Sequence, residues 1–244
     1  MPKLAIIAAL ERELEPLVRT WPKSKFIHDG RPFTSYHTDH AVAICGGIGA
    51  ECARRAAEAA VAAHSPEILI SAGIAGAAVP ELRVGDTVFP AVVVDTRDGS
   101  RHQTAIQHAV FPRAPLERRV LASYPAIAGP AEKRQLAKSY GAHLVDMEGA
   151  SVARAAQVHG LEFLAVKAIS DQLDFEMAGL NRFVRSGQMA TGALVVYLMP
   201  RPWLWPKMIR LGSNTRLASR NLCARLHERV LAHTISCGHS DGRR

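Results

Sequence analysis

Three short apolar runs limit the possible folds more than any other feature of this 244-residue chain. Residues 4–10, 67–72 and 163–169 are almost continuously apolar, which is typical of strands that are covered on both faces. Stretches with helical character separate such runs along the chain. This alternation predicts an α/β fold, a three-layer α/β/α sandwich with a mixed, twisted central sheet and helices on both faces.

The pattern also predicts individual elements. We expect further strands at 33–38, 41–45, 87–95 and 143–145, and helices at 50–64, 131–140, 148–159, 178–199 and 215–231. The small residues 73–78 read as a loop, and 96–130 has the weakest pattern.

Charge divides the chain unevenly. Residues 201–244 contain nine Lys or Arg and two acids, whereas 1–200 contain 21 and 20. We therefore expect a catalytic domain over 1–199 and a basic extension over 200–244, helical to about 232 and then disordered. The balanced main fold argues against a nucleic-acid partner.

The sequence indicates a soluble, cytoplasmic protein. Its first apolar run is too short to span a membrane and is followed at once by Glu11, Glu13 and Glu15, unlike a signal peptide. The four cysteines have no Cys-x-x-Cys spacing, which favours reduced and mostly buried thiols over a zinc site or disulfides.

Acidic residues follow the expected strands and are the main candidates for chemistry. Glu13 comes just after the first apolar run, while Glu148 and Asp171 fall where strands are expected to meet helices. Ligands of open α/β sheets bind at the carboxyl ends of strands, so these acids could face one ligand. Alternatively, Asp146, Ser170 or Asp171 could be helix N-caps, and the first-turn glutamates a solvated helix face.

A glycine-rich turn, 46–49, precedes the expected helix 50–64. It does not match a dinucleotide fingerprint, because Cys52 stands where the third glycine is required. A tight strand-to-helix turn is the better interpretation.

Four motifs in one order carry a family resemblance. These are 6–13 (IIAALERE), 72–76 with 82–86 (AGIAG, LRVGD), 146–148 (DME) and 168–171 (AISD). Over residues 3–199 the chain resembles the nucleoside phosphorylase superfamily, most closely its methylthioadenosine and S-adenosylhomocysteine nucleosidases.

The resemblance implies cleavage of a purine–ribose bond without a metal or organic cofactor, by a homodimer. It implies that Asp171 donates a proton toward the purine N7, that Glu148 and Met147 hold the ribose hydroxyls, and that Glu13 activates water. Further substrate-site residues implied by the resemblance are Ile74, Ala75, Gly76, Ser170 and Lys167.

The chemistry requires two acids in different protonation states, since the base gains electrons while the sugar becomes cationic. Asp171 must carry a proton, so we expect burial beside Ile169 to raise its pKa. Glu148 should stay ionised in order to accept hydrogen bonds and stabilise positive charge.

The nucleophile is expected to be water. Phosphorolytic relatives place an arginine-bearing phosphate loop near the N-terminus, whereas this chain has Glu11, Glu13 and Glu15 there, which would repel phosphate. Arg12, Arg54 or Arg55 would weaken this argument if they pointed inward.

Three departures from the family pattern leave the substrate open. Ile74 replaces a hydroxyl-bearing residue and Lys167 a common arginine, both at the expected water site, and 123–129 lacks the usual base-contacting pattern. A nucleoside-binding protein without catalysis is therefore an alternative.

The basic extension has two interpretations. Trp203 and Trp205 lie among cations, and Ala218, Leu222, Leu226 and Val230 share one helix face, as in helices that lie on anionic membranes. Residues 201–232 would then make a peripheral contact at the inner membrane face, and the substrate could be a lipid-linked adenosyl compound, as the resemblance to the hopanoid-associated branch implies. Alternatively, the helix packs on its own core or on a dimer mate.

Overall fold

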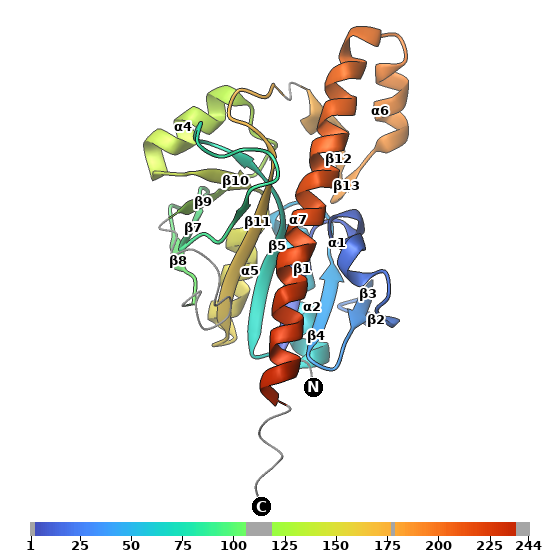
Figure 1. The fold of residues 1–244 in the computed structure, drawn as a ribbon, viewed down its shortest axis with the longest axis vertical. Helices are drawn as coiled ribbons and strands as arrows, with labels where there is room; N and C mark the ends of the chain where they lie inside the picture. The colour runs from blue at the N-terminus through green and yellow to red at the C-terminus, as the bar shows by residue number, and fades with distance from the viewer. Residues whose placement is uncertain (1–2, 106–118, 177–178, 238–244) are drawn as a thin grey trace, which may run out of the picture.

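The computed structural model describes residues 3–105, 119–176 and 179–237, and the side chains among them except those of 185 and 229–237. A mixed, 11-stranded sheet forms its centre (Figure 1). The strands are β1 (Leu4–Ala8), β2 (Lys23–His28), β3 (Arg31–His37), β4 (Ala41–Cys45), β5 (Ile68–Ala77), β6 (Thr87–Val88), β7 (Val92–Asp95), β8 (Arg101–Gln103), β9 (Val120–Ser123), β10 (Leu144–Asp146) and β11 (Glu162–Asp171). Their order is β2-β3-β4-β1-β5-β10-β9-β7-β8, with β11 pairing β5 and β6.

Helices cover both faces of the sheet. They are α1 (Glu11–Val18), α2 (Ala50–His64), α4 (Pro130–Tyr140), α5 (Gly149–Val158), α6 (Thr191–Leu198) and α7 (Trp205–Cys237), with 3₁₀ turns η1 (Leu180–Phe183) and η2 (Pro202–Leu204). Along β1, Leu4 and Ile6 join an apolar cluster with α1 and α7, whereas Ala5 and Ile7 join one with α2 and α5. This alternation explains the continuous apolar run and confirms the predicted fold class.

The small residues 73–77 form the end of β5 and only Ala78 lies outside it, so the prediction of a loop over 73–78 is wrong. β5 pairs β11 in parallel over most of its length and then pairs β10 in antiparallel fashion through Gly76 and Ala77. A Cβ atom at Gly76 would lie 2.9 Å from Asp171 Oδ2 and 2.9 Å from Lys133 Cε. The small side chains therefore permit a close approach beside the strand end.

The chain after β11 also differs from expectation. In place of a core helix over 178–199, its described residues form η1, the two-stranded hairpin β12 (Val184–Arg185) and β13 (Gln188–Met189), and the short helix α6. Residues with positive φ explain the break, because Gly179, Ser186 and Gly187 have φ of 83°, 50° and 79°.

The C-terminal helix is longer than predicted. α7 begins at Trp205, with Pro206 in its first turn where proline is tolerated, and runs to Cys237, through part of the stretch expected to be disordered. Ala218, Leu222 and Leu226 are at most 1% exposed and pack on the sheet. The membrane-facing arrangement of these residues is therefore wrong, and the packed alternative holds; the Val230 side chain and residues 238–244 lie outside the described part.

Candidate active site

A cavity of about 180 Å³ opens where β5, β10 and β11 end. Most of the residues singled out from the sequence line it, namely Glu13, Ile74, Ala75, Gly76, Met147, Glu148, Ser170 and Asp171. Three acids that are distant along the chain thus share one cavity. Lys167 does not line it. We call this space the acidic cavity.

Glu148 directly precedes α5, and two backbone N–H groups fix its side chain. Its Oε1 accepts a hydrogen bond from Gly49 N at 2.7 Å, and its Oε2 accepts one from Met147 N at 3.2 Å. Gly49 has φ of 97°, which explains the glycine in the 46–49 turn. Burial, and next the nearby Asp146, raise the pKa of Glu148 to about 7. Burial and Asp146 thus work against the ionised form expected for Glu148, whereas the two backbone N–H groups favour it.

Glu13 approaches from α1 and is 4% exposed. Burial and then repulsion by Glu148 raise its pKa to about 7. Its Oε2 has no hydrogen-bond partner among the described residues. On its other side, Cys223 Sγ of α7 donates to the Glu13 carbonyl oxygen at 3.3 Å. Glu13 therefore offers an unpaired carboxylate oxygen at a fixed position.

Asp171 is the last residue of β11 and is held from two sides. Ser170 Oγ donates to Oδ1 at 2.7 Å, and Lys133 Nζ of α4 forms a buried ion pair with Oδ2 and also donates to Gln172 O at 3.0 Å. η1 begins only at Leu180, so Asp171 is not a helix cap. The apolar neighbour Ile169 was expected to control the Asp171 carboxyl. The structure adds the Lys133 cation beside it.

Sequence reasoning missed Lys133. Lys133 and Leu136 are the buried residues of α4, three positions apart and thus on one face. This spacing was a usable signal that Lys133 points inward. It was overlooked because most residues around Lys133 in the sequence are polar.

Lys167 lies behind the cavity wall. Its Nζ forms an ion pair with Asp146 at 2.8 Å and donates to Ser71 Oγ at 3.0 Å. Asp146 in turn accepts a hydrogen bond at 2.9 Å from the backbone N–H of Gly149, the first residue of α5, but the N-cap position of this helix is Glu148. The Lys167 ammonium opposes the rise in the pKa of both Glu13 and Glu148.

The arginines near the expected nucleophile site divide into two groups. Arg12 lines the cavity and also opposes the rise in the Glu13 pKa. Arg54 and Arg55 form ion pairs on the surface with Glu51 and Glu58. Only Arg12 therefore weakens the argument against phosphate.

Apolar side chains form much of the cavity lining. Ala126, Ile127 and Ala128, from the segment expected to contact the base, line it together with Leu180, Met189, Leu211 and Thr215. The Asn181 side chain fixes the loop, because it accepts from Ile127 N at 2.7 Å and donates to Ile127 O at 3.0 Å. Residues after β11 thus form part of the cavity wall.

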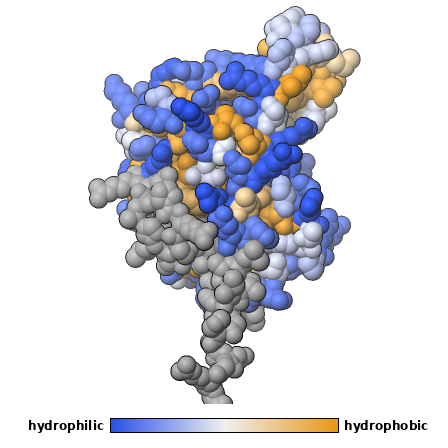
Figure 2. Space-filling model, viewed as in Figure 1, coloured by the Kyte–Doolittle hydropathy of each residue, from blue (hydrophilic) through white to orange (hydrophobic). Residues whose placement is uncertain are grey.

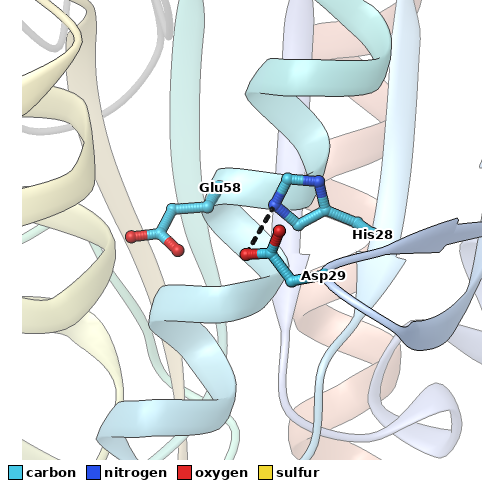
Figure 3. Close-up of side chains that lie close together, drawn as sticks. All are labelled: His28, Asp29 and Glu58. Atoms are coloured by element: carbon cyan, nitrogen blue, oxygen red, sulfur yellow. Dashed lines mark ion pairs between the residues drawn. The ribbon is translucent and has the colours of Figure 1, made fainter.

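One group of possible metal ligands lies elsewhere, among the residues that the structure describes. Figure 3 shows His28, Asp29 and Glu58, which are close to one another but do not line the acidic cavity. Arg54 Nη1 already donates to both oxygens of Glu58, at 2.6 Å each. We therefore assign no metal to this group.

The cysteines are not paired where their side chains are described. Cys45 and Cys52 are half-buried and Cys223 is buried. Burial raises the pKa of the Cys45 and Cys223 thiols to about 12. Thiols of this kind are poor nucleophiles.

Comparisons with known proteins identify relatives of the whole fold. A family model described as the phosphorylase superfamily matches residues 3–128 and 119–196. No curated protein sequence matches the chain. Among solved structures, the 5′-methylthioadenosine/S-adenosylhomocysteine nucleosidase of Helicobacter pylori has a TM-score of 0.69 at 19% identity, covering 93% of this chain and 98% of its own.

Two further structures have similar scores. The corresponding nucleosidase of Neisseria meningitidis has a TM-score of 0.69 at 17% identity, covering 94% of this chain and 99% of its own. Futalosine hydrolase of Helicobacter pylori has a TM-score of 0.67 at 18% identity, covering 93% and 98%. At these identities the similarity concerns the fold.

Proposed function

The chain belongs to the phosphorylase superfamily, and on this premise we propose that it hydrolyses the N-glycosidic bond of a 5′-substituted adenosine and releases adenine. The observation that carries the proposal is the convergence of Glu13, Glu148 and Asp171 on one cavity. The similar nucleosidase structures include complexes with analogues of such nucleosides, which supports the same substrate class.

Asp171 is the proposed general acid. As the C1′–N9 bond breaks, its electron pair moves into the purine, and N7 takes the proton from Asp171. The Lys133 ammonium is paired with the same carboxylate: it positions Asp171 and passes it the proton that Asp171 delivers to N7, and the proton that Glu13 takes from water returns to Lys133 through solvent. General acid catalysis of this kind contributes roughly 10²- to 10⁴-fold.

Glu148 is the proposed ribose ligand. With both oxygens already anchored by backbone N–H groups, its carboxylate is oriented before substrate binds. Ionised Glu148 accepts hydrogen bonds from the ribose hydroxyls and stabilises the positive charge on the sugar. Met147 lies beside it on the cavity wall.

Glu13 is the proposed base for water. Its unpaired Oε2 accepts a proton from water as the water oxygen bonds to C1′. The products are adenine and a 5-substituted ribose, so atoms and charge balance. Since Glu13 must be ionised and its pKa is about 7, we expect kcat/KM to fall below about pH 7.

Hydrolysis is favoured over phosphorolysis by charge. Glu13 and Glu148 together disfavour a phosphate dianion, although Arg12 is a cation at the same cavity. The test is incubation of the purified protein with methylthioadenosine or adenosine, with and without phosphate. Release of adenine and free sugar without phosphate is expected. A strict need for phosphate would contradict hydrolysis, and absence of base release from any purine nucleoside would contradict the enzyme assignment.

A nucleoside-binding protein without turnover is the competing class. Two residues motivate this alternative. Ile74 stands at the expected water site, and Lys167, which was expected there, lies behind the cavity wall. Tight binding of methylthioadenosine in calorimetry, with no adenine formed, would select it.

A lipid-linked adenosyl compound is a second candidate substrate. The apolar entrance formed by Leu180, Met189 and Leu211 favours an apolar 5′ group. A substrate screen that spans small and lipid 5′ groups would decide between the candidates, and futalosine belongs in it because a similar structure is its hydrolase.

We further propose a homodimer in the cytoplasm, with part of the population held at the inner membrane face through the exposed first part of the 201–232 segment, since Ala218, Leu222 and Leu226 farther along it are buried. Within the described residues, no helix is both long and apolar enough to cross a bilayer. Sedimentation velocity tests the dimer, and cell fractionation tests the location.

A further inference from the structure

The segment after β13 places apolar side chains in solvent. Seven of the nine most exposed large apolar residues in the described chain fall between 195 and 217, whereas only Ile27 and Val158 lie elsewhere. The seven are Val195, Val196, Met199, Trp203, Trp205, Ile209 and Leu217. We call α6, η2 and the start of α7, residues 191–210, the apical hairpin.

The apical hairpin stands clear of the sheet (Figure 1). α6 has the sequence TGALVVYL and no buried residue, and its side chains Val195 and Val196 are 51% and 69% exposed. Figure 2 shows apolar surface on the same projection. An exposed apolar cluster of this extent marks an interaction surface, because folding alone gains nothing from it.

Charge identifies the kind of partner. Residues 177–227 contain eight Lys or Arg and not one Asp or Glu. Arg201 stacks on Tyr197 with 4.0 Å between guanidinium and ring centroid, and Lys207 and Arg210 lie 5.6 Å from the Phe175 ring centroid. None of these three cations forms an ion pair among the described residues. They remain available to anions.

We propose that the apical hairpin is a docking surface for an anionic lipid bilayer. Tryptophan combines an apolar body with a polar N–H and suits the level of the lipid headgroups, and both Trp203 and Trp205 are about half exposed or more, at 69% and 49%. The surrounding Lys and Arg side chains attract anionic headgroups, while Val196 and Ile209 enter the acyl boundary. A second copy of this chain would meet the same positive charge and be repelled.

The docked enzyme has its entrance near the lipid. Met189 and Leu211, which line the cavity, flank the apical hairpin on either side in sequence. Docking therefore brings the acidic cavity close to amphipathic nucleosides in the bilayer. Only this consequence of docking rests on the proposed function.

Flotation of the full chain with vesicles tests the proposal. We expect binding to phosphatidylcholine vesicles that contain phosphatidylglycerol, little binding to pure phosphatidylcholine, and weaker binding at high salt. The double variant Trp203→Ser with Ile209→Ser should lower the affinity about tenfold or more. The double variant Ile27→Ser with Val158→Ser removes equally exposed residues elsewhere and should leave it unchanged.

The outcomes are decisive without substrate, so failure of the nucleosidase proposal would not affect them. Equal binding to neutral vesicles, or unchanged binding of the Trp203/Ile209 variant, would overturn the docking proposal. Sedimentation velocity in the absence of lipid completes the test. A change from dimer to monomer in the Trp203/Ile209 variant alone would show that the apical hairpin is an interface between two copies of the chain. That result would also overturn the docking proposal.

Discussion

The acidic cavity and the apical hairpin depart from ordinary folding rules in opposite directions. The cavity buries charged groups, including Glu13, Glu148 and the Lys133–Asp171 pair. The hairpin exposes apolar groups, such as Val196 and Ile209. Each arrangement lowers stability and is therefore expected where function requires it. The difference is that most of the buried charged groups have partners, Glu13 Oε2 excepted, whereas Val196 and Ile209 are left 69% and 71% exposed.

The largest effect is expected on catalysis. Asp171→Asn keeps the size of the side chain and an acceptor for Lys133 but removes the transferable proton, so kcat should fall roughly 10²- to 10⁴-fold. Adenine release measures this. Asp174→Asn, at an exposed residue paired with Arg134, is the matched control and should stay near wild type. Comparable activity of the two variants would exclude Asp171 as the acid.

The next effect concerns the buried ion pair. Lys133→Met leaves the Asp171 carboxylate without its cation and should lower the free energy of unfolding by about 3–5 kcal/mol. Addition of Asp171→Asn to Lys133→Met should recover much of that loss, and urea denaturation measures both. Lys138→Met, at an exposed position of the same helix, should change little.

The pH dependence of kcat in the Lys133→Met variant shows whether Lys133 positions Asp171 for catalysis or only stabilises the fold. If Lys133 acts through Asp171, Lys133→Met should shift the alkaline limb of the pH profile. A lower kcat with an unchanged profile would restrict Lys133 to a structural role.

A third prediction compares the exposed start of α7 with its buried middle. Leu222 is fully buried, so Leu222→Ala should lower the free energy of unfolding by about 2–5 kcal/mol. Ile209 is 71% exposed, and Ile209→Ala should change it by less than about 0.5 kcal/mol. Thermal and urea unfolding measure both. A large loss at Ile209 would mean that the hairpin supports the fold.

The smallest effect is a gain in stability at the cavity. Since the folded-state pKa of Glu13 is raised from 4.5 to about 7, folded protein binds more protons than unfolded protein in that window, and stability falls as pH rises through it. Glu13→Gln removes this cost, so it should raise the free energy of unfolding by roughly 1–3 kcal/mol at about pH 8 and by little at about pH 5. The same gain at both pH values would contradict the linkage.

The sequence predicted the cavity better than the hairpin for a physical reason. Strands buried on both faces leave a clear apolar signal, and acids at their ends can be located without coordinates, as for Glu148 and Asp171. Helices 50–64 and 131–140 were found within one residue at each end. The exposed strand β2 and the three-residue strand β8 lack that signal and were missed. β9 is apolar and buried but only four residues long, and it was missed as well.

Tertiary contacts decided what the sequence could not. The contact of Lys133 with Asp171 joins residues 38 positions apart, and no local pattern indicates it. The apolar spacing in 178–199 resembled a buried helix, but turns at Gly179 and Gly187 redirect the chain into solvent. Amphipathic spacing alone cannot tell whether an apolar face meets protein or lipid.

The continuity of α7 constrains how sequences of this type can change length. One helix carries Trp205 in the apical hairpin and Cys223 against the Glu13 backbone, about 27 Å apart along its axis. Insertion of one residue between them would rotate one end by about 100° relative to the other. Either the tryptophans or the contact with Glu13 would then face the wrong direction, so tolerated insertions and deletions should come in steps of about a whole helical turn.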